Sequence, residues 1–258
     1  MDKACCALAP VSAEYTPKGT YSTIAGLKTY TVQPPNSTSP PARAIIDIYD
    51  VFGPAPQTLQ GADRLAALTN SVVLVPDWFG GDYCQPGWLG PDAGEEEKAA
   101  LEAFVGRRVR RLEDTVEKLV EVRRELGKKW PGVEGHVGVF GLCFGGKIAV
   151  LATEKKGNEG VGRRFCVSGA AHPARLAAEE HEVLNVPHIC LASKDEDAGV
   201  VAEVREIVSK PDRKGYVETY ETMHHGWMGA RADLKNEENL KEFERGYNAV
   251  AEFFNKYL

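Results

Sequence analysis

Apolar segments of strand length alternate with amphipathic segments of helix length from residue 44 to the end of this 258-residue chain. The pattern predicts strands at residues 44–49, 71–76, 136–140, 164–168, 186–192 and 216–221. It predicts helices at residues 57–68, 95–126 with a break at Gly106, 144–154, 200–209 and about 237–257. Residues 71–76, SVVLVP, are almost entirely apolar, as is typical of a strand buried on both faces of a parallel sheet. The alternation therefore predicts an α/β fold with a mostly parallel central sheet and helices on both faces.

The N-terminal part departs from this alternation. A β-rich run at residues 21–32 predicts a hairpin, and the proline-rich stretch 33–42 (QPPNSTSPPA) predicts a loop too short to separate domains. We therefore assign residues 1–258 to a single domain, with residues 1–20 as a loosely attached N-terminal segment.

Charge and hydropathy argue against several classes of protein. The net charge of −6 lacks the basic footprint of nucleic-acid binding, and acids interleaved with the arginine-rich run 107–111 predict a solvated helix face. No apolar run approaches the roughly 18 residues of a membrane span, and no secretory signal is evident. We expect a cytoplasmic protein, a monomer or weak homodimer, that acts on a small molecule without a nucleic-acid or membrane partner.

Six cysteines are spread along the chain without a CxxC pair, which favours reduced thiols over a disulfide scaffold. They are Cys5, Cys6, Cys84, Cys143, Cys166 and Cys190. We predict that the Cys5–Cys6 doublet is a frayed terminus rather than a lipidation site. Since His136, His181 and His188 have no carboxylate or cysteine at metal spacing, no metal site is predicted.

The sharpest motif is GLCFGG at residues 141–146, between an apolar strand and a helix. It has the G-x-nucleophile-x-G pattern of a nucleophile elbow, with Cys143 where serine is more usual. Glycines leave room for the crowded backbone, and the N-terminus of the following helix favours a thiolate and a developing oxyanion. The alternatives are an inert buried cysteine and a phosphate-binding loop, but no Gly-x-Gly-x-x-Gly or Walker spacing is present. The motif therefore predicts a cysteine nucleophile.

An acid and a histidine follow in the order that such an elbow requires. The run SKDED at 193–197 follows one predicted strand, and MHHGW at 223–227 follows the next. We favour Asp195 over Asp197 because it is nearer the strand end, and His225 over His224 because Gly226 follows it. His225 would activate the thiol, and Asp195 would fix the tautomer of its imidazole.

These motifs resemble the dienelactone hydrolase family of α/β-hydrolases, in particular its fungal branch. The resemblance includes IYDVFG at 48–53 and VVLVPDWF at 72–79, and it extends from about residue 21 to the C-terminal helix. It implies a single-domain α/β-hydrolase fold, a Cys-Asp-His triad carried by Cys143, Asp195 and His225, and no cofactor.

The resemblance also implies an oxyanion hole formed by the backbone N–H groups of Val51 and Phe144. Asp50 occupies the position of a family glutamate that contacts the resting thiol; the alternative is that it is a turn or helix-capping residue. Arg231 is a candidate for holding a substrate carboxylate, although a surface role explains it equally well. The remaining candidate pocket residues are aromatic or imidazole side chains in the loops: Trp78, Phe79, Tyr83, Trp88, His172 and Trp227.

The resulting functional hypothesis is a carboxylic ester or lactone hydrolase that works through a covalent thioester. Two alternatives use the same residues. One is a tailoring enzyme that forms or rearranges a lactone of a polyketide-like or thioester metabolite, and the other is a ligand-binding relative without turnover. Motifs do not distinguish these, because the same fold supports many functions.

Overall fold

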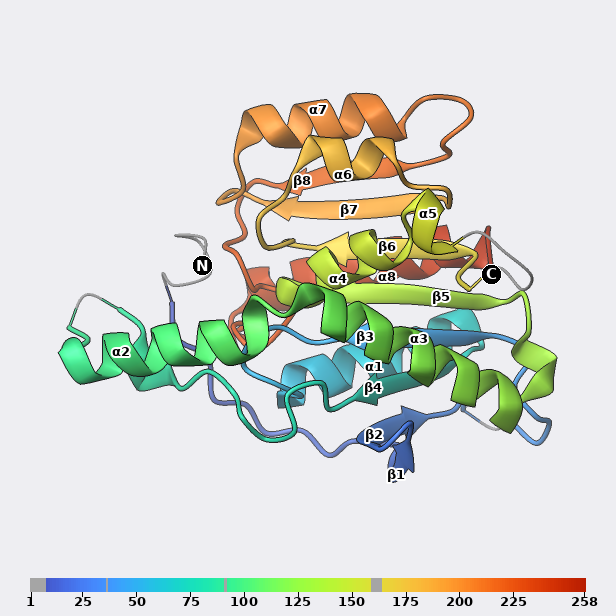
Figure 1. Ribbon diagram of the computed structural model, residues 1–258, viewed down its shortest axis with the longest axis horizontal. Coiled ribbons are helices and arrows are strands. Elements are labelled where there is room, and N and C mark those ends of the chain that lie inside the picture. Colours follow the sequence, from blue (N-terminus) through green and yellow to red (C-terminus); the bar gives the residue numbers. More distant parts are fainter. Residues whose placement is uncertain (1–7, 36, 91, 159–163) are drawn as a thin grey trace.

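The computed structural model describes residues 8–35, 37–90, 92–158 and 164–258 (Figure 1). These residues contain an eight-stranded sheet in the order β1-β2-β4-β3-β5-β6-β7-β8. The strands are β1 (Thr20–Ile24), β2 (Leu27–Val32), β3 (Ala44–Ile48), β4 (Val72–Pro76), β5 (Val137–Leu142), β6 (Val167–Ala171), β7 (His188–Ser193) and β8 (Tyr216–Tyr220). All neighbouring strands from β4 through β3, β5, β6 and β7 to β8 are parallel. The β1–β2 hairpin is added at one edge, where β2 pairs antiparallel with β4. The predicted mostly parallel sheet is confirmed.

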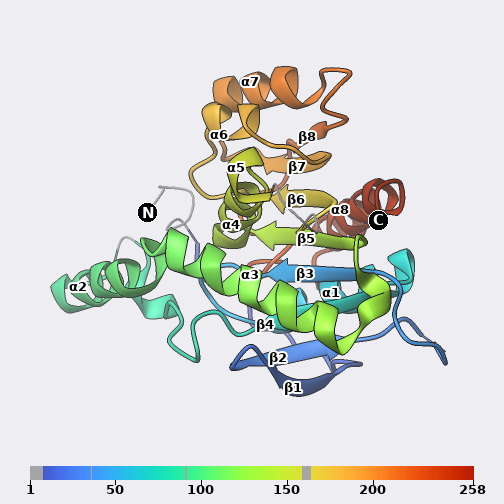
Figure 2. The ribbon, with the colours of Figure 1, turned by 45° about the vertical axis from the view of Figure 1, so that its right-hand side comes forward.

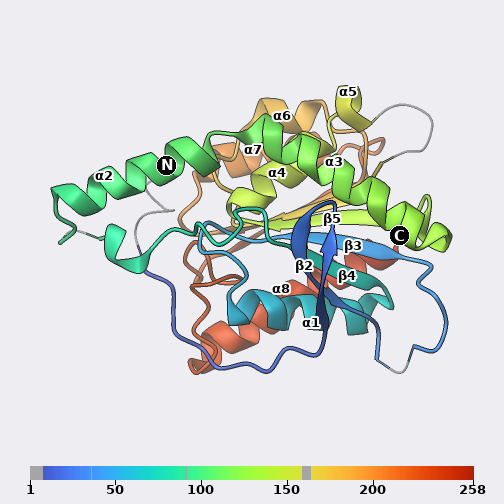
Figure 3. The same ribbon diagram turned by 60° about the horizontal axis from the view of Figure 1, so that its bottom comes forward.

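Helices cover both faces of the sheet, as predicted. They are α1 (Pro56–Thr69), α2 (Glu95–Phe104), α3 (Leu112–Lys129), α4 (Phe144–Ala152), α5 (Lys155–Asn158), α6 (Ala178–Glu182), α7 (Ala198–Val208) and α8 (Glu237–Asn255). Figure 3 shows α1 and α8 on one face, with α3, α4, α6 and α7 on the other. The central strands are therefore fully buried, as the apolar pattern of β4 indicated.

The helix predicted at 95–126 is interrupted near Gly106. A π-helical turn at Val105–Val109 separates α2 from α3, and this is where the break was predicted. Helix α2 extends beyond the sheet at the edge where the parallel strands end (Figures 1 and 2). That edge is where ligands bind in open α/β sheets.

The N-terminal segment is attached more firmly than the sequence suggested. The Val11 N–H donates to the Ala230 carbonyl (2.9 Å), and the Gln57 side-chain amide donates to the Val11 carbonyl (2.8 Å). Farther along, the Tyr15 hydroxyl donates to the Asp63 carboxylate (2.6 Å). The segment therefore lies along the body of the protein from residue 8 onward, which corrects the expectation of a loose attachment.

Four of the six cysteines lie among the described residues, and no disulfide joins any two of Cys84, Cys143, Cys166 and Cys190. The Cys5–Cys6 doublet lies outside the described residues. Within the described part of the chain, no helix is both long and apolar enough to cross a membrane.

Strand β3 carries a carboxyl group into the core. Asp47 is fully buried, and neither of its oxygens has a hydrogen-bond partner of standard geometry among the described residues. Burial penalises the charged form and raises the pKa of Asp47 to about 8. The native protein therefore keeps this proton at neutral pH, whereas the unfolded chain releases it near pH 4.

We expect stability to fall as pH rises from about 4 to about 8, because unfolding releases the Asp47 proton in that window. Asp47→Asn removes this titration, so the variant should be more stable than the wild type at about pH 8 and nearly equal to it at about pH 4. Urea unfolding at several pH values measures the difference. A difference that does not change with pH would show that Asp47 does not titrate in this way.

Candidate active site

The GLCFGG motif forms a sharp turn between β5 and α4. Cys143 precedes the first residue of α4 and has φ 52° and ψ −111°, a conformation that is strained for a residue with a Cβ atom. The turn places Cys143 at the C-terminal end of a central strand, where it is 2% exposed. Its backbone thus has the strain expected of a nucleophile elbow.

Glycines are required here because three backbone segments meet. A Cβ added at Gly141 would lie 2.0 Å from the backbone of Gly145, and one at Gly145 would lie 1.9 Å from the carbonyl oxygen of Ile48. The second contact brings the start of α4 against the end of β3. The glycines therefore set how closely the elbow approaches the neighbouring strand.

The three acids after β7 have three different contacts. Asp195 accepts a hydrogen bond from the backbone N–H of His225 (2.8 Å), whereas Glu196 Oε1 lies 2.7 Å from His225 Nδ1. The second oxygen of Glu196 accepts from the backbone N–H of Ser193. Asp197 caps α7 by accepting from the backbone N–H of Val200 (3.0 Å). One carboxylate thus holds the histidine backbone, one holds its ring, and one begins a helix.

This arrangement corrects the predicted orienting acid. Asp195 was expected to contact the imidazole, but its shorter side chain reaches the histidine backbone from an exposed position. Glu196 is one methylene longer, and its side chain is 4% exposed beside the 2% exposed ring of His225. A buried carboxylate at Nδ1 fixes the ring orientation and leaves Nε2 to act on the substrate side.

The rings of the two adjacent histidines, His224 and His225, also have different partners. His225 is the one whose ring contacts a buried carboxylate. His224 Nε2 instead lies 3.2 Å from the Arg231 carbonyl oxygen, inside the 222–236 loop. Gly226, with φ 98°, makes the turn directly after His225. The structure therefore places the ring of His225, rather than that of His224, against the buried carboxylate.

The two predicted oxyanion donors lie just beyond the ends of neighbouring strands. Phe144 is the first residue of α4, so its N–H belongs to the unsatisfied first turn of that helix. Val51 lies in the turn after β3, the strand that pairs with β5. Because Gly145 packs against Ile48, these two turns lie side by side at the same sheet edge.

Asp50 has both oxygens bonded to backbone groups. One accepts from the Phe52 N–H (2.9 Å) and the other from the Ala230 N–H (2.9 Å). Burial raises the pKa of Asp50, while these two hydrogen bonds and the nearby Arg231 charge oppose the shift. Asp50 thus acts as a turn residue that also ties β3 to the 222–236 loop, which is the alternative left open by the sequence.

Arg231 is buried rather than on the surface. It is 2% exposed, and its guanidinium donates to the carbonyls of Leu8 (2.6 Å) and His225 (3.4 Å). It also stacks over the Phe52 ring, 5.1 Å from the centroid. These contacts hold the N-terminal segment against the histidine loop, and the role of Arg231 in carboxylate binding stays a prediction.

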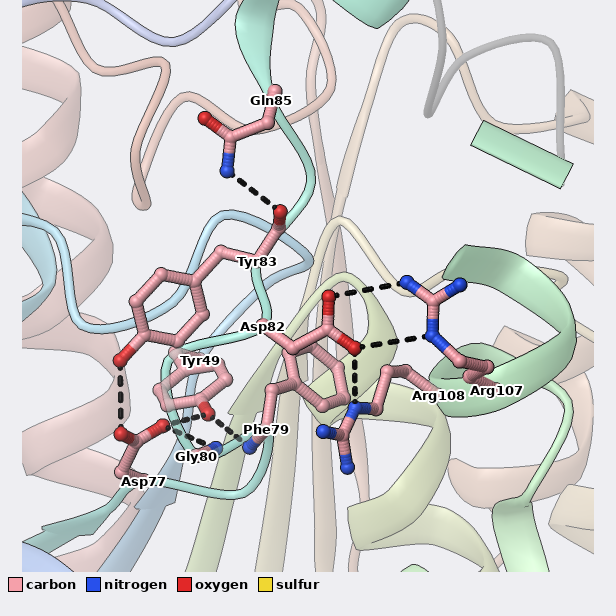
Figure 4. Close-up of polar contacts among 9 residues, drawn as sticks. All are labelled: Tyr49, Asp77, Phe79, Gly80, Asp82, Tyr83, Gln85, Arg107 and Arg108. Atoms are coloured by element: carbon pink, nitrogen blue, oxygen red, sulfur yellow. Dashed lines mark hydrogen bonds and ion pairs between the residues drawn. The ribbon is translucent and has the colours of Figure 1, made fainter. Parts of the chain in front are cut away.

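Hydrogen bonds and ion pairs hold the loop after β4 in place (Figure 4). The Tyr49 hydroxyl accepts from the Phe79 N–H (2.7 Å) and donates to Asp77 (2.8 Å), which also accepts from the Tyr83 hydroxyl (2.9 Å). The Phe79 ring then contacts Phe144, with 5.1 Å between centroids. Of the predicted aromatic residues, Phe79 therefore lies directly beside the nucleophile turn.

The outer part of this loop is tied to the π-helical turn. Asp82 forms ion pairs with Arg107 and Arg108, whose side chains are 54% and 37% exposed (Figure 4). Farther out, Trp88 is partly buried against Phe104, the last residue of α2. The ion pairs of Asp82 are therefore surface contacts, whereas the Tyr49 hydroxyl is buried.

We expect the two anchors to differ in their effect on stability. Tyr49→Phe leaves the buried Phe79 N–H without its acceptor and should cost about 1–3 kcal/mol. Asp82→Asn weakens only exposed ion pairs and should cost less than about 1 kcal/mol. Urea unfolding of both variants beside the wild type measures the difference. Equal losses would mean that the surface ion pairs hold the loop as strongly as the buried hydroxyl does.

Two further pocket candidates have different positions from those predicted. Trp227 is fully buried in the core, stacked on Tyr220 at 4.3 Å and packed against Gly246 of α8, so it does not line the site. Trp78 lies with Arg108 and Lys118 around a surface hollow.

His172 is the second imidazole of the site. It follows β6, is fully buried, and its ring lies 5.0 Å from that of His225 in an edge-to-face arrangement. The segment that carries His172 is hydrogen-bonded to the backbone of Cys143 on both sides of His172. The Cys143 N–H donates to the Ala171 carbonyl (3.1 Å), and the Ala174 N–H donates to the Cys143 carbonyl (3.0 Å). His172 was predicted only as a pocket residue. The structure places it directly beside the site.

The site residues therefore come from four strand ends and meet in a closed, desolvated region. Cys143 and His225 are each 2% exposed. Among the described residues, no group of three or more His, Cys, Asp or Glu side chains is positioned to hold a metal ion.

Comparison with known proteins finds related sequences and related folds. An uncharacterized AIM2 family protein of Schizosaccharomyces pombe is 34% identical over 249 residues, covering 95% of this chain and 93% of its own. Among solved structures, a provisionally named dienelactone hydrolase from Klebsiella pneumoniae has a TM-score of 0.70 at 15% identity, covering 94% of this chain and 100% of its own. The dienelactone hydrolase from Anabaena variabilis has a TM-score of 0.63 at 15% identity, covering 94% and 98%.

The two structural similarities concern the fold, an α/β-hydrolase sheet with its elbow after the central strand β5. The match to a sequence family is more specific. The family model of the dienelactone hydrolases matches residues 27–258, which include every strand of the sheet except β1, together with Cys143, Glu196 and His225. By this match, and with the elbow and histidine loop in place, the chain belongs to the dienelactone hydrolase family.

Proposed function

We propose that this protein hydrolyses a small carboxylic ester or lactone through a Cys143–His225–Glu196 triad. The observation that carries the proposal is the buried contact of 2.7 Å between Glu196 and His225 at the edge where the Cys143 elbow lies. Family membership supports hydrolysis. In this proposal Cys143 is the nucleophile, His225 is the base and Glu196 is the acid that orients the histidine.

In the first half-reaction, His225 accepts the Cys143 proton through Nε2, because Nδ1 is held by Glu196. The thiolate attacks the substrate carbonyl and forms a C–S bond. The N–H groups of Phe144 and Val51 stabilise the negative oxygen of the tetrahedral intermediate. The intermediate collapses with cleavage of the C–O bond, and the leaving alkoxide takes the proton from His225.

In the second half-reaction, His225 removes a proton from water, and the resulting hydroxide attacks the thioester carbonyl. The C–S bond breaks, the acid product leaves, and the thiolate regains its proton from His225. Esters and lactones suit this site better than amides, because a thiolate is expelled from the intermediate more readily than an amine.

The test is turnover of a panel of small lactones and short-chain esters by wild type beside Cys143→Ala. We expect turnover by the wild type only, with an acyl adduct on Cys143 visible by intact-protein mass spectrometry during steady state. Turnover that survives in Cys143→Ala would overturn the proposed nucleophile. Ligand binding without turnover or adduct in the wild type would instead indicate a binding protein on this fold.

A further inference from the structure

His172 has unmet hydrogen-bonding capacity beside the nucleophile. It is fully buried, and neither ring nitrogen has a partner of standard geometry in the part of the chain that the structure describes. A buried polar group without a partner costs about 1–3 kcal/mol, so such groups are normally satisfied by protein, water or ligand. His188 is also buried, but one of its ring nitrogens is satisfied: Nδ1 lies 2.7 Å from the hydroxyl of Ser168, and only Nε2 has no partner of standard geometry among the described residues.

The backbone holds the His172 ring in place. His172 has φ 38°, a conformation that is unfavourable for a side chain with a Cβ atom, and its N–H donates to the Leu191 carbonyl (2.7 Å). The flanking residues Ala171 and Ala174 are both hydrogen-bonded to the backbone of Cys143. Strain that is maintained by such bonds is common at functional sites. The imidazole is therefore fixed in position relative to the nucleophile.

We propose that His172 is the specificity residue for the substrate, and that it binds a hydroxyl group carried by the lactone or ester. The inference rests on the proposed function, since it assigns a substrate class to the same site. A neutral imidazole has one N–H donor and one acceptor nitrogen, and a hydroxyl group offers the matching acceptor and donor.

Burial and the nearby positive groups favour the neutral form of the His172 ring. Burial lowers the pKa of His172 well below its usual value, and the nearby His225 and Arg231 lower it further. Arg231 donates to the backbone carbonyls of Leu8 and His225. Asp50 and Glu196 place carboxyl groups around the same loop. A hydroxyl matches the one donor and one acceptor of the neutral ring, whereas a carboxylate offers acceptors only.

The experiment compares three lactones of one ring size: γ-butyrolactone, its β-hydroxy derivative, and a derivative that carries a carboxylate. For the wild type we expect kcat/KM to be at least about 10-fold higher for the hydroxylactone than for the other two. His172→Phe should bring the hydroxylactone and the plain lactone within a few-fold of each other, and His172→Gln should keep part of the preference.

A matched control is His188→Phe, which also replaces a buried histidine but at the opposite end of the sheet. It should leave the ratio of the hydroxylactone to the plain lactone unchanged. If His172→Phe lowers kcat/KM for both lactones equally, or if the carboxylate derivative is preferred, the inference is wrong.

A second measurement does not depend on the folding of His172→Phe. Titration of the Cys143→Ala protein with the hydroxylactone should shift the imidazole NMR signals of His172, and the plain lactone should not. Equal shifts with both lactones would overturn the inference. Failure of the proposed function has a different signature, because no lactone or ester would then be turned over through Cys143 in the wild type.

Discussion

Glu196→Gln should lower kcat by about 10³-fold or more, whereas Asp195→Asn should lower it by less than about 10-fold. The carboxylate of Glu196 accepts the Nδ1 proton of His225, so that Nε2 is unprotonated and able to take the thiol proton. A glutamine amide also has donors, and it favours the tautomer in which Nε2 carries the proton. Asparagine at 195 keeps an oxygen that accepts the His225 backbone N–H.

Steady-state kinetics on the best ester or lactone measures both variants, with kcat and KM determined separately. Glu196→Asp is the control for reach, because it keeps the charge and shortens the side chain by one methylene. We expect its activity to lie between those of the wild type and Glu196→Gln. A larger loss in Asp195→Asn than in Glu196→Gln would return the orienting role to Asp195.

The second large effect is expected at the elbow. Gly145→Ala should destabilise the protein by about 3 kcal/mol or more, because the added Cβ would meet the Ile48 backbone oxygen at 1.9 Å and neither main chain has room to retreat. Gly146→Ala is the matched control. Its Cβ would meet the Cβ of Ala170 at 3.1 Å and the backbone oxygen of Gly141 at 3.3 Å, contacts that shifts of a few tenths of an ångström relieve, so the cost should be about 1 kcal/mol.

Urea unfolding at one pH measures both glycine variants, and esterase activity of the soluble protein reports on the elbow. We expect Gly145→Ala to lose activity as well as stability, since a displaced α4 no longer presents the Phe144 N–H next to β3. If the two variants were equally stable, the close approach between α4 and β3 would not be a constraint on this turn.

Much of the fold was predictable, because the apolar runs of the central strands and the glycine pattern of the elbow are local properties of the sequence. The position of Cys143 at a strand–helix turn follows from residues 141–146 alone. The helix break near Gly106 was also predictable, although its π-helical form was not.

The orienting acid was not predictable in the same way. Three acids follow one another at 195–197, and their roles depend on side-chain length and on the direction of a tight turn, which composition does not show. One signal was available: Asp197 directly precedes the helix at Ala198–Val208, as a capping residue would. This signal excludes Asp197 as the acid that orients the histidine ring, but it does not show whether Asp195 or Glu196 has that position.

Arg231 and Trp227 illustrate a second difficulty. Both lie in a loop close to His225, and nearness in sequence suggested nearness to the substrate. The structure turns Arg231 toward the N-terminal segment and Trp227 toward α8. Both orientations depend on elements that are distant in sequence, which a local pattern cannot reveal.

Between residues 8 and 11, the N-terminal segment is attached to the rest of the protein mainly through its backbone atoms. Leu8 and Val11 offer carbonyls to Arg231 and Gln57, while their side chains are 46% and 36% exposed. Substitutions at these two exposed positions thus leave the acceptors intact, whereas changes at Arg231 or Gln57 remove the donors. Mutational tolerance should therefore be high along the segment and low in the two distant side chains that hold it.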